Sequence, residues 1–126
     1  MIRILAIDDH PLLVKDQWED SNLKNLAILL PLEEVTSLQQ ASNLVQYYQP
    51  DVVLLDFYIG SFNGDEILKN LEAAYPDVMF LGNSSIAGKF TGIVNIDKNG
   101  RKLFDVLIPL IRKELEEKKN VRKSKH

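Results

Sequence analysis

Residues 51–64 read DVVLLDFYIGSFNG, and the interpretation of the whole chain starts from this stretch. Val52 to Leu55 form a continuous apolar run, which is typical of a parallel strand buried on both faces. The run ends at the carboxylate of Asp56, and the helix-start sequence 63–66, NGDE, follows. Open α/β sheets bind ligands at the carboxyl ends of their strands, so Asp56 is a candidate site residue. The simpler interpretation is a surface aspartate in a turn.

The composition indicates one globular domain. The chain has 126 residues, of which 45% are apolar, and this is enough to bury a core. It contains no cysteine, which excludes disulfides and thiolate metal sites and permits a reducing compartment. No signal-like segment or apolar run of twenty residues is present, so we expect a cytoplasmic protein without a membrane partner.

The charges are unevenly distributed along the chain. Residues 112–126 hold seven of the fifteen Lys and Arg residues against three acids, and residues 1–111 hold eight against fifteen acids. Because the body is acidic, we expect no direct nucleic acid binding. We expect one domain over residues 1–118 and a basic, disordered tail over residues 119–126.

Four more short apolar runs predict the other strands, at residues 2–7, 26–30, 78–81 and 92–96. Between them, apolar residues at helical spacing predict helices that begin at Pro11, at Thr36 or Ser37, and near Gly64. A last helix carries the apolar residues between Leu103 and Leu115. Strands that alternate with helices indicate a parallel sheet covered by helices on both faces.

The fourth crossover is short. Only residues 85–90 are available for a helix after the fourth strand, and Gly88 weakens it. The sequence therefore predicts an α/β fold with a single doubly wound, five-stranded parallel sheet and a shortened fourth helix.

Polar residues follow three of the predicted strands. Asp8 and Asp9 follow the first strand, Asp56 the third and Lys98 the fifth, and Gly64 lies eight residues beyond Asp56. Considered alone, the acidic pair could simply be favourable charges at a helix N-terminus. Together, and in this order, these residues resemble the receiver domain of two-component response regulators, over nearly the whole chain.

The resemblance implies a flavodoxin-like (βα)5 fold and a function. Asp56 would accept a phosphoryl group from a histidine kinase or phosphotransfer protein, and Lys98 would contact the phosphoryl oxygens. Asp8, Asp9 and Asp56 would hold Mg²⁺ with the backbone carbonyl of Tyr58. Physical chemistry agrees, because crowded carboxylates need a compensating cation and oxygen ligands select a hard ion.

Several positions depart from the family pattern, among them Asn99 and Gly60, where receivers commonly have proline. Receivers place Thr or Ser at the end of the fourth strand. Counting forward from Asp56 without gaps gives Ser84, whereas ending the strand at Leu81 gives Gly82, and we take Ser84 as the site residue. The aromatic residue common in the fifth strand of receivers is Asn95 here, which is too small to fill the pocket of a ring.

Two classes of function follow. The first is a phosphoacceptor switch. Its enzymatic activity would be at most self-phosphorylation from a phosphodonor and autodephosphorylation. A homodimer is possible. The second is an atypical receiver that acts as a protein interaction module without a phosphorylation-driven switch. A flavodoxin-like cofactor carrier is less favoured, since Asp8 and Asp9 would repel a phosphate group.

Overall fold

The computed structural model describes most of the chain up to residue 97 and five residues beyond it. The described residues are 2–8, 11–19, 27–31, 33–59, 62–84, 90, 92–97, 109, 112–113 and 116–117. The elements are β1 (Ile2–Ile7), α1 (Pro11–Glu19), β2 (Ala27–Leu29), α2 (Leu38–Tyr48), β3 (Val52–Leu55), β4 (Tyr58–Ile59), β5 (Phe62–Asn63), α3 (Gly64–Ala74), β6 (Met79–Ser84) and β7 (Asn95–Asp97).

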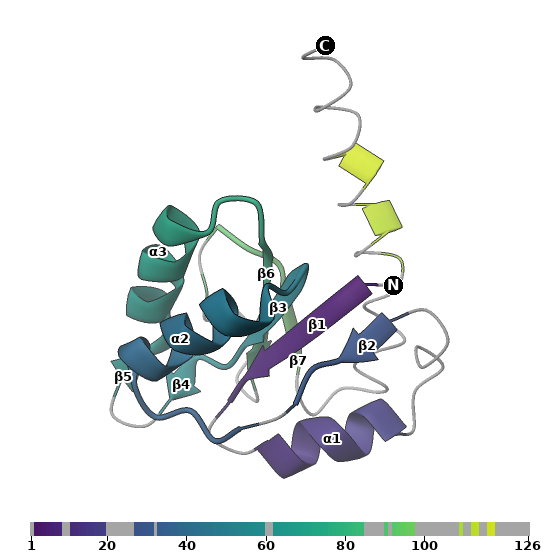
Figure 1. Ribbon diagram of the computed structural model, residues 1–126, viewed down its shortest axis with the longest axis horizontal. Coiled ribbons are helices and arrows are strands. Elements are labelled where there is room, and N and C mark those ends of the chain that lie inside the picture. Colours follow the sequence, from purple (N-terminus) through teal and green to yellow (C-terminus); the bar gives the residue numbers. More distant parts are fainter. Residues whose placement is uncertain are drawn as a thin grey trace.

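Five strands form one sheet in the order β2-β1-β3-β6-β7, and every neighbouring pair is parallel. The chain first moves outward from β1 to β2, then crosses to β3 and continues to β6 and β7 (Figure 1). The predicted doubly wound sheet is confirmed. β3 lies at its centre, and all four of its residues are buried, as its unbroken apolar run predicts.

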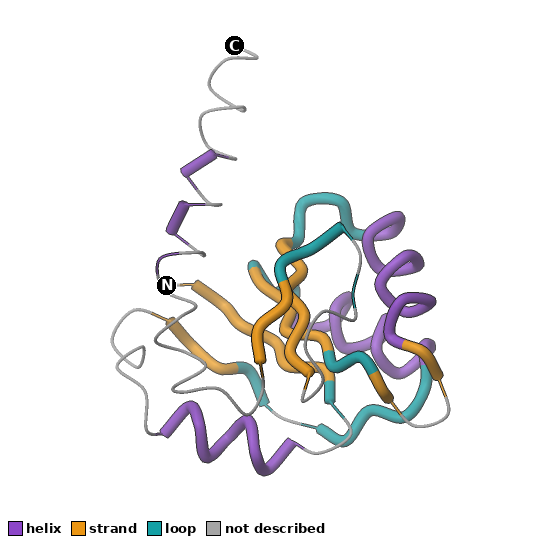
Figure 2. Tube along the Cα trace, turned by 180° about the vertical axis from the view of Figure 1, so that it is seen from behind, coloured by secondary structure: helices purple, strands orange, loops and turns teal. Residues whose placement is uncertain are grey.

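Helices cover both faces of the sheet (Figures 1 and 2). Alternate residues of a strand point to opposite faces, so each strand supplies two apolar layers. Val53 and Leu55 belong to a first core, which includes residues of α2 and α3. Val52 and Leu54 belong to a second core, which includes Val14 of α1. The two cores together fix the central strands between the helical layers.

The start of α2 is capped as its sequence predicts. Ser37 has extended backbone angles, and its side chain accepts a hydrogen bond of 3.1 Å from the backbone N–H of Gln40. In return, the Gln40 side-chain oxygen accepts a hydrogen bond of 3.1 Å from the backbone N–H of Thr36. This reciprocal pair satisfies donors that would otherwise lack partners at the helix start.

Two strands differ from the sequence prediction. β6 extends through Gly82 and Ser84 rather than ending at Leu81, because Gly82 pairs with β3 and residues 82–84 pair with β7. β7 begins at Asn95 instead of residue 92, because Gly92 has a φ of 82° and is not extended. In both cases, tertiary pairing and backbone conformation decide over local propensity.

A short ribbon was not predicted. β4 and β5 form an antiparallel pair in which Tyr58 lies opposite Asn63, between the end of β3 and the start of α3. The predicted short fourth helix, apart from Phe90, and the basic tail over 119–126 lie outside the described residues. Of the last predicted helix, residues 109, 112–113 and 116–117 are described, and they are helical and exposed.

Candidate functional site

Three buried polar side chains gather at one edge of the sheet. Asp8 is 1% exposed, Asp56 7% and Asn83 1%, and they are the buried polar or charged residues of the described chain. Each follows the last residues that pair across β1, β3 and β6, so the three occupy one position along neighbouring strands. Neighbouring strands lie about 4.8 Å apart. We call these three residues the polar row.

The polar row faces one side of the sheet. On each strand, the residues two and four positions before the polar one belong to the second core. Side chains two residues apart on a strand share a face, so the three polar side chains point to the same side. The core residues concerned are Ile4, Ala6, Val52, Leu54, Met79 and Leu81.

Backbone hydrogen bonds hold Asp8 and Asp56 in extended conformations. The backbone N–H of Asp56 donates to the carbonyl of Ile7 at 3.0 Å, which continues the ladder between β1 and β3. The carbonyl of Asp8 accepts from the N–H of Val35 at 3.2 Å, and Asp8 forms a parallel bridge with Glu34. The backbone at both residues is therefore held by pairing with neighbouring segments.

Gly64 lets helix α3 begin close to Asp56. A Cβ atom at Gly64 would lie 2.7 Å from the carbonyl oxygen of Phe57 and 2.8 Å from that of Asp56, which is closer than side chains pack. The Gly64 N–H also donates to the Phe57 carbonyl. The spacing of eight residues between Asp56 and Gly64 therefore has a steric cause, since only glycine fits where α3 meets the end of β3.

An aromatic pair lies in the first core, on the face of the sheet opposite the polar row. The rings of Phe57 and Phe90 meet edge to face with centroids 5.2 Å apart, and Phe90 is 4% exposed. Asn95 holds Phe90 in place. Its side chain accepts a hydrogen bond of 3.1 Å from the Phe90 N–H and donates one of 2.9 Å to the Phe90 carbonyl. Gly82 provides the space, because a Cβ there would lie 2.6 Å from the Asn95 side-chain oxygen.

Sequence analysis did not foresee this arrangement or the burial of Asn83. It treated Asn95 as the loss of an aromatic residue, whereas the ring beside Phe57 comes from Phe90, five residues earlier in the chain. Asn95 is the polar residue within the predicted strand 92–96, and this is the available sequence signal, since strands are depleted of asparagine. Asn83 carries no such signal, because it follows the predicted end of its strand.

The other predicted site residues are described only in part. Asp9 and Lys98 lie outside the described residues. The backbone of Tyr58 begins β4, and Ser84 is the last residue of β6; their side chains are not described. The roles assigned to these residues stay predictions.

The donors of the polar row suit a hard cation. They are two carboxylates and an amide, and the amide oxygen of Asn83 has no hydrogen-bond partner in the described chain. Oxygen ligands of this kind are those that Mg²⁺ prefers. Within the described residues, no group of three or more His, Cys, Asp or Glu side chains could hold a metal ion. The predicted triad includes Asp9, which lies outside the described residues, so it stays a prediction.

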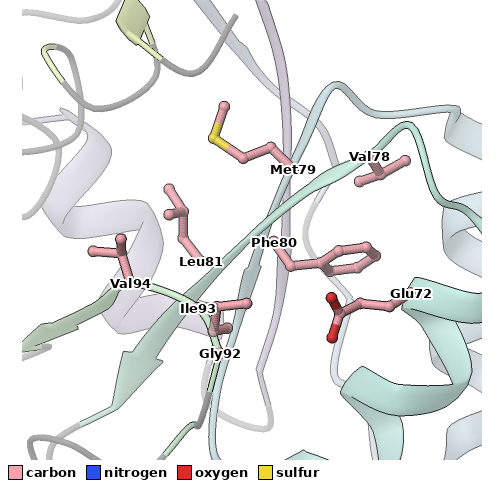
Figure 3. A pocket seen from close by; sticks show the side chains of 8 residues that line it. All are labelled: Glu72, Val78, Met79, Phe80, Leu81, Gly92, Ile93 and Val94. Atoms are coloured by element: carbon pink, nitrogen blue, oxygen red, sulfur yellow. The ribbon is translucent and has the colours of Figure 1, made fainter. Parts of the chain in front are cut away.

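A cavity of about 380 Å³ lies near the amino ends of β6 and β7, away from the polar row at their carboxyl ends (Figure 3). It is lined by the start of β6, the segment before β7 and Glu72 of α3. Its other lining residues are Val78, Met79, Phe80, Leu81, Gly92, Ile93 and Val94. One carboxylate among apolar side chains does not form a site for charged chemistry, so the polar row is the candidate site.

No helix in the described part of the chain is long and apolar enough to cross a membrane.

Comparison with known proteins places the fold. No family model matches the chain. Over 83 residues it is 35% identical to the transcriptional regulatory protein DegU of Brevibacillus brevis. The matched stretch covers 64% of this chain and 33% of that protein. The chain thus spans about a third of the length of this relative.

Solved structures agree at lower identity. The signal receiver domain of a DNA binding response regulator from Colwellia psychrerythraea matches with a TM-score of 0.70 and 19% identity, over 92% of this chain and 99% of that one. RcsB of Salmonella enterica, solved bound to promoter rprA with the phosphomimetic BeF3⁻, matches with a TM-score of 0.72 and 14% identity. This match covers 96% of this chain and 67% of that one.

These findings correct the prediction about nucleic acid as a partner. We expected no direct nucleic acid binding, but the similar proteins include a transcriptional regulator, a DNA binding response regulator and a protein solved on promoter DNA. The expectation was wrong because it rested on the charge of residues 1–111, whereas the DegU relative is about three times as long as the stretch it shares with this chain. The fold of this chain is that of a response regulator receiver domain, and its resemblance to two-component signalling proteins is confirmed.

Proposed function

We propose that this chain is a phosphoacceptor receiver domain, and that Asp56 takes a phosphoryl group from a histidine kinase or phosphotransfer protein. The observation that carries the proposal is the polar row. It holds the carboxylate of Asp56 beside that of Asp8 at the carboxyl edge of a receiver fold. A carboxylate in such a position can act as a nucleophile toward phosphorus.

The transfer is a simple exchange of bonds. A carboxylate oxygen of Asp56 forms the new bond to phosphorus as the bond from phosphorus to the donor's imidazole nitrogen breaks. The electron pair of the broken bond stays on the nitrogen. The imidazole of the donor is therefore the leaving group, and Asp56 becomes an acyl phosphate. We propose that Lys98 and the hydroxyl of Ser84 contact the phosphoryl oxygens, whose charge is then shared among several partners.

The residues present also fit a bound Mg²⁺ ion. Asp8, Asp9 and Asp56 would hold it, together with the backbone carbonyl of Tyr58. When bound, the ion supplies positive charge that offsets the carboxylates and the phosphoryl oxygens. The orphaned oxygen of Asn83 in the same row supports this assignment, because it is a further acceptor without a partner in the described chain.

The wider role follows from the similar proteins. We propose that the domain spans residues 1–118, is followed by a basic tail over 119–126 and works in the cytoplasm. We further propose that phosphorylation of Asp56 controls transcription through DNA binding. The names of the DegU relative and of the structure on promoter DNA support this output.

Intact-mass measurement tests the transfer. The chain is incubated with Mg²⁺ and a small phosphodonor such as acetyl phosphate, and we expect the mass of one phosphoryl group to be added. Asp56→Asn should remain unlabelled, and chelation of the metal should prevent labelling. Asp16→Asn is the matched control, because Asp16 is an exposed residue of α1 and should leave labelling unchanged.

A second function is favoured by the arrangement around Asn95. Both polar groups of its side chain are used on the backbone of Phe90, which fixes the ring beside Phe57. A receiver in which Phe90 is held in this way could serve as an interaction module without a phosphorylation switch. If the protein stays unlabelled under conditions that label a control receiver, this second function replaces the first.

A further inference from the structure

Asn83 is an unusual residue for its position. Its side chain is 1% exposed, yet its Oδ1 atom has no hydrogen-bond partner among the described residues. Buried polar atoms are hydrogen-bonded in the great majority of cases, and exceptions call for an explanation. The residues two and four positions earlier on the same face of β6, Leu81 and Met79, are apolar and belong to the second core.

The surroundings of Asn83 are acidic. It is the third member of the polar row, next to Asp56 on β3, with Asp8 beyond on β1. On its other side, its backbone pairs with Ile96 of β7, a residue type without polar side-chain atoms. A deprotonated carboxylate has no proton to donate. The neighbouring strands therefore provide acceptors or apolar groups, and the free oxygen of Asn83 needs a donor from elsewhere.

A hydrated cation provides such a donor. Two carboxylates in a row attract a hard cation, and Mg²⁺ keeps several of its waters when proteins bind it. A metal-bound water is polarised by the ion and is a strong hydrogen-bond donor. An amide oxygen can accept this bond without adding negative charge to an edge that already holds two carboxylates.

We propose that Asn83 is a positioning residue of the cation site, whose Oδ1 accepts a hydrogen bond from a water of the Mg²⁺ shell. The inference rests on the proposed function of the polar row and extends it to a residue outside the acidic set. Partners of this outer kind usually change metal affinity by 10 to 100-fold when they are replaced. Asn83 therefore sets how tightly the domain holds the ion before any phosphoryl group arrives.

Calorimetric titration of the full chain with MgCl₂ tests this role. Asn83→Leu keeps the branched shape of the side chain and has no acceptor, and we expect its Kd for Mg²⁺ to rise at least tenfold, which is about 1.4 kcal/mol. Asn83→Asp keeps the oxygen, and it should bind Mg²⁺ at least as tightly as the parent. Asn43→Leu is the control, because Asn43 is exposed on α2 and its replacement should leave the Kd unchanged.

Thermal unfolding without Mg²⁺ separates this role from a purely structural one. Asn83→Leu should then be at least as stable as the parent, since it removes an unsatisfied buried acceptor. A variant that is less stable but binds Mg²⁺ as tightly as the parent would overturn the inference and leave the proposed function intact. A parent protein that does not bind Mg²⁺ at all would overturn both.

A second measurement needs no variant. Mn²⁺ replaces Mg²⁺ at oxygen sites and broadens the NMR signals of nearby protons. The side-chain NH₂ signals of Asn83 should broaden at substoichiometric Mn²⁺, while those of Asn70, exposed on α3, stay sharp. If the two residues broaden together only at excess Mn²⁺, Asn83 does not face the ion and the inference is wrong.

Discussion

Gly82→Ala tests the packing of the Phe90 ring. An added Cβ would lie 2.6 Å from the Asn95 side-chain oxygen and 2.7 Å from the ring of Phe90, so at least one of the two must move. Overpacking of this kind costs about 1–3 kcal/mol. If Asn95 moves, its two hydrogen bonds to the Phe90 backbone are also lost, at about 1 kcal/mol each.

We therefore expect Gly82→Ala to lower the free energy of unfolding by roughly 2–4 kcal/mol, and Tm by about 10 °C. Urea unfolding followed by circular dichroism measures this change. Gly92→Ala is the matched control. No atom lies within 4 Å of its added Cβ, and its φ of 82° should cost about 1 kcal/mol through backbone strain alone.

A double-mutant cycle identifies the residue that is displaced. Asn95→Ala removes the oxygen that the new methyl group meets, so the double variant Gly82→Ala/Asn95→Ala should be more stable than the sum of the single changes predicts. We expect a coupling of about 1–2 kcal/mol. Additivity within about 0.5 kcal/mol, or a Gly82→Ala protein as stable as the parent, would refute the described packing.

Three further predictions concern other parts of the structure. Ser37→Ala removes the cap that binds the Gln40 N–H, and it should cost about 1 kcal/mol in urea unfolding. Phe90→Ala should cost about 3–5 kcal/mol and weaken the aromatic near-ultraviolet circular dichroism, since it empties a buried position. Mg²⁺ at a hundredfold its Kd should raise the free energy of unfolding by about 2.7 kcal/mol in thermal melts, and Asp9→Ala should abolish this gain.

The sheet was predictable because its signals are local and strong. β1 and β3 begin and end where the apolar runs 2–7 and 52–55 do, since a strand buried on both faces needs an unbroken run. The place of Asp56 followed from the same rule, because it is the first polar residue after β3. Alternation of strands and helices then fixed the parallel sheet and its crossovers.

The end of β6 was not predictable in the same way. Gly82, Asn83 and Ser84 have the composition of a turn, and nothing within the segment indicates a strand. They are extended because β3 pairs with Gly82 on one side and β7 pairs with all three residues on the other. The burial of Asn83 depends on this pairing, so its place in the polar row was hidden from sequence reasoning.

The packing of Phe90 also limits what a phosphoryl group on Asp56 could move. A switch needs contacts that differ between two states. To release Phe90, the protein would give up a buried ring, at about 2–3 kcal/mol, and two hydrogen bonds from Asn95, at about 1 kcal/mol each.

That loss, about 4–5 kcal/mol, is close to the roughly 5.5 kcal/mol needed to invert a two-state equilibrium from 1:99 to 99:1. Phosphorylation would have to supply nearly all of it at Asp56, through contacts that the unphosphorylated domain lacks. A segment held by few backbone pairs moves at lower cost. The ribbon of β4 and β5 has two residues in each strand and joins Asp56 directly to α3. If Asp56 is phosphorylated as proposed, the response should therefore be concentrated in this ribbon, while β7 and Asn95 keep their positions.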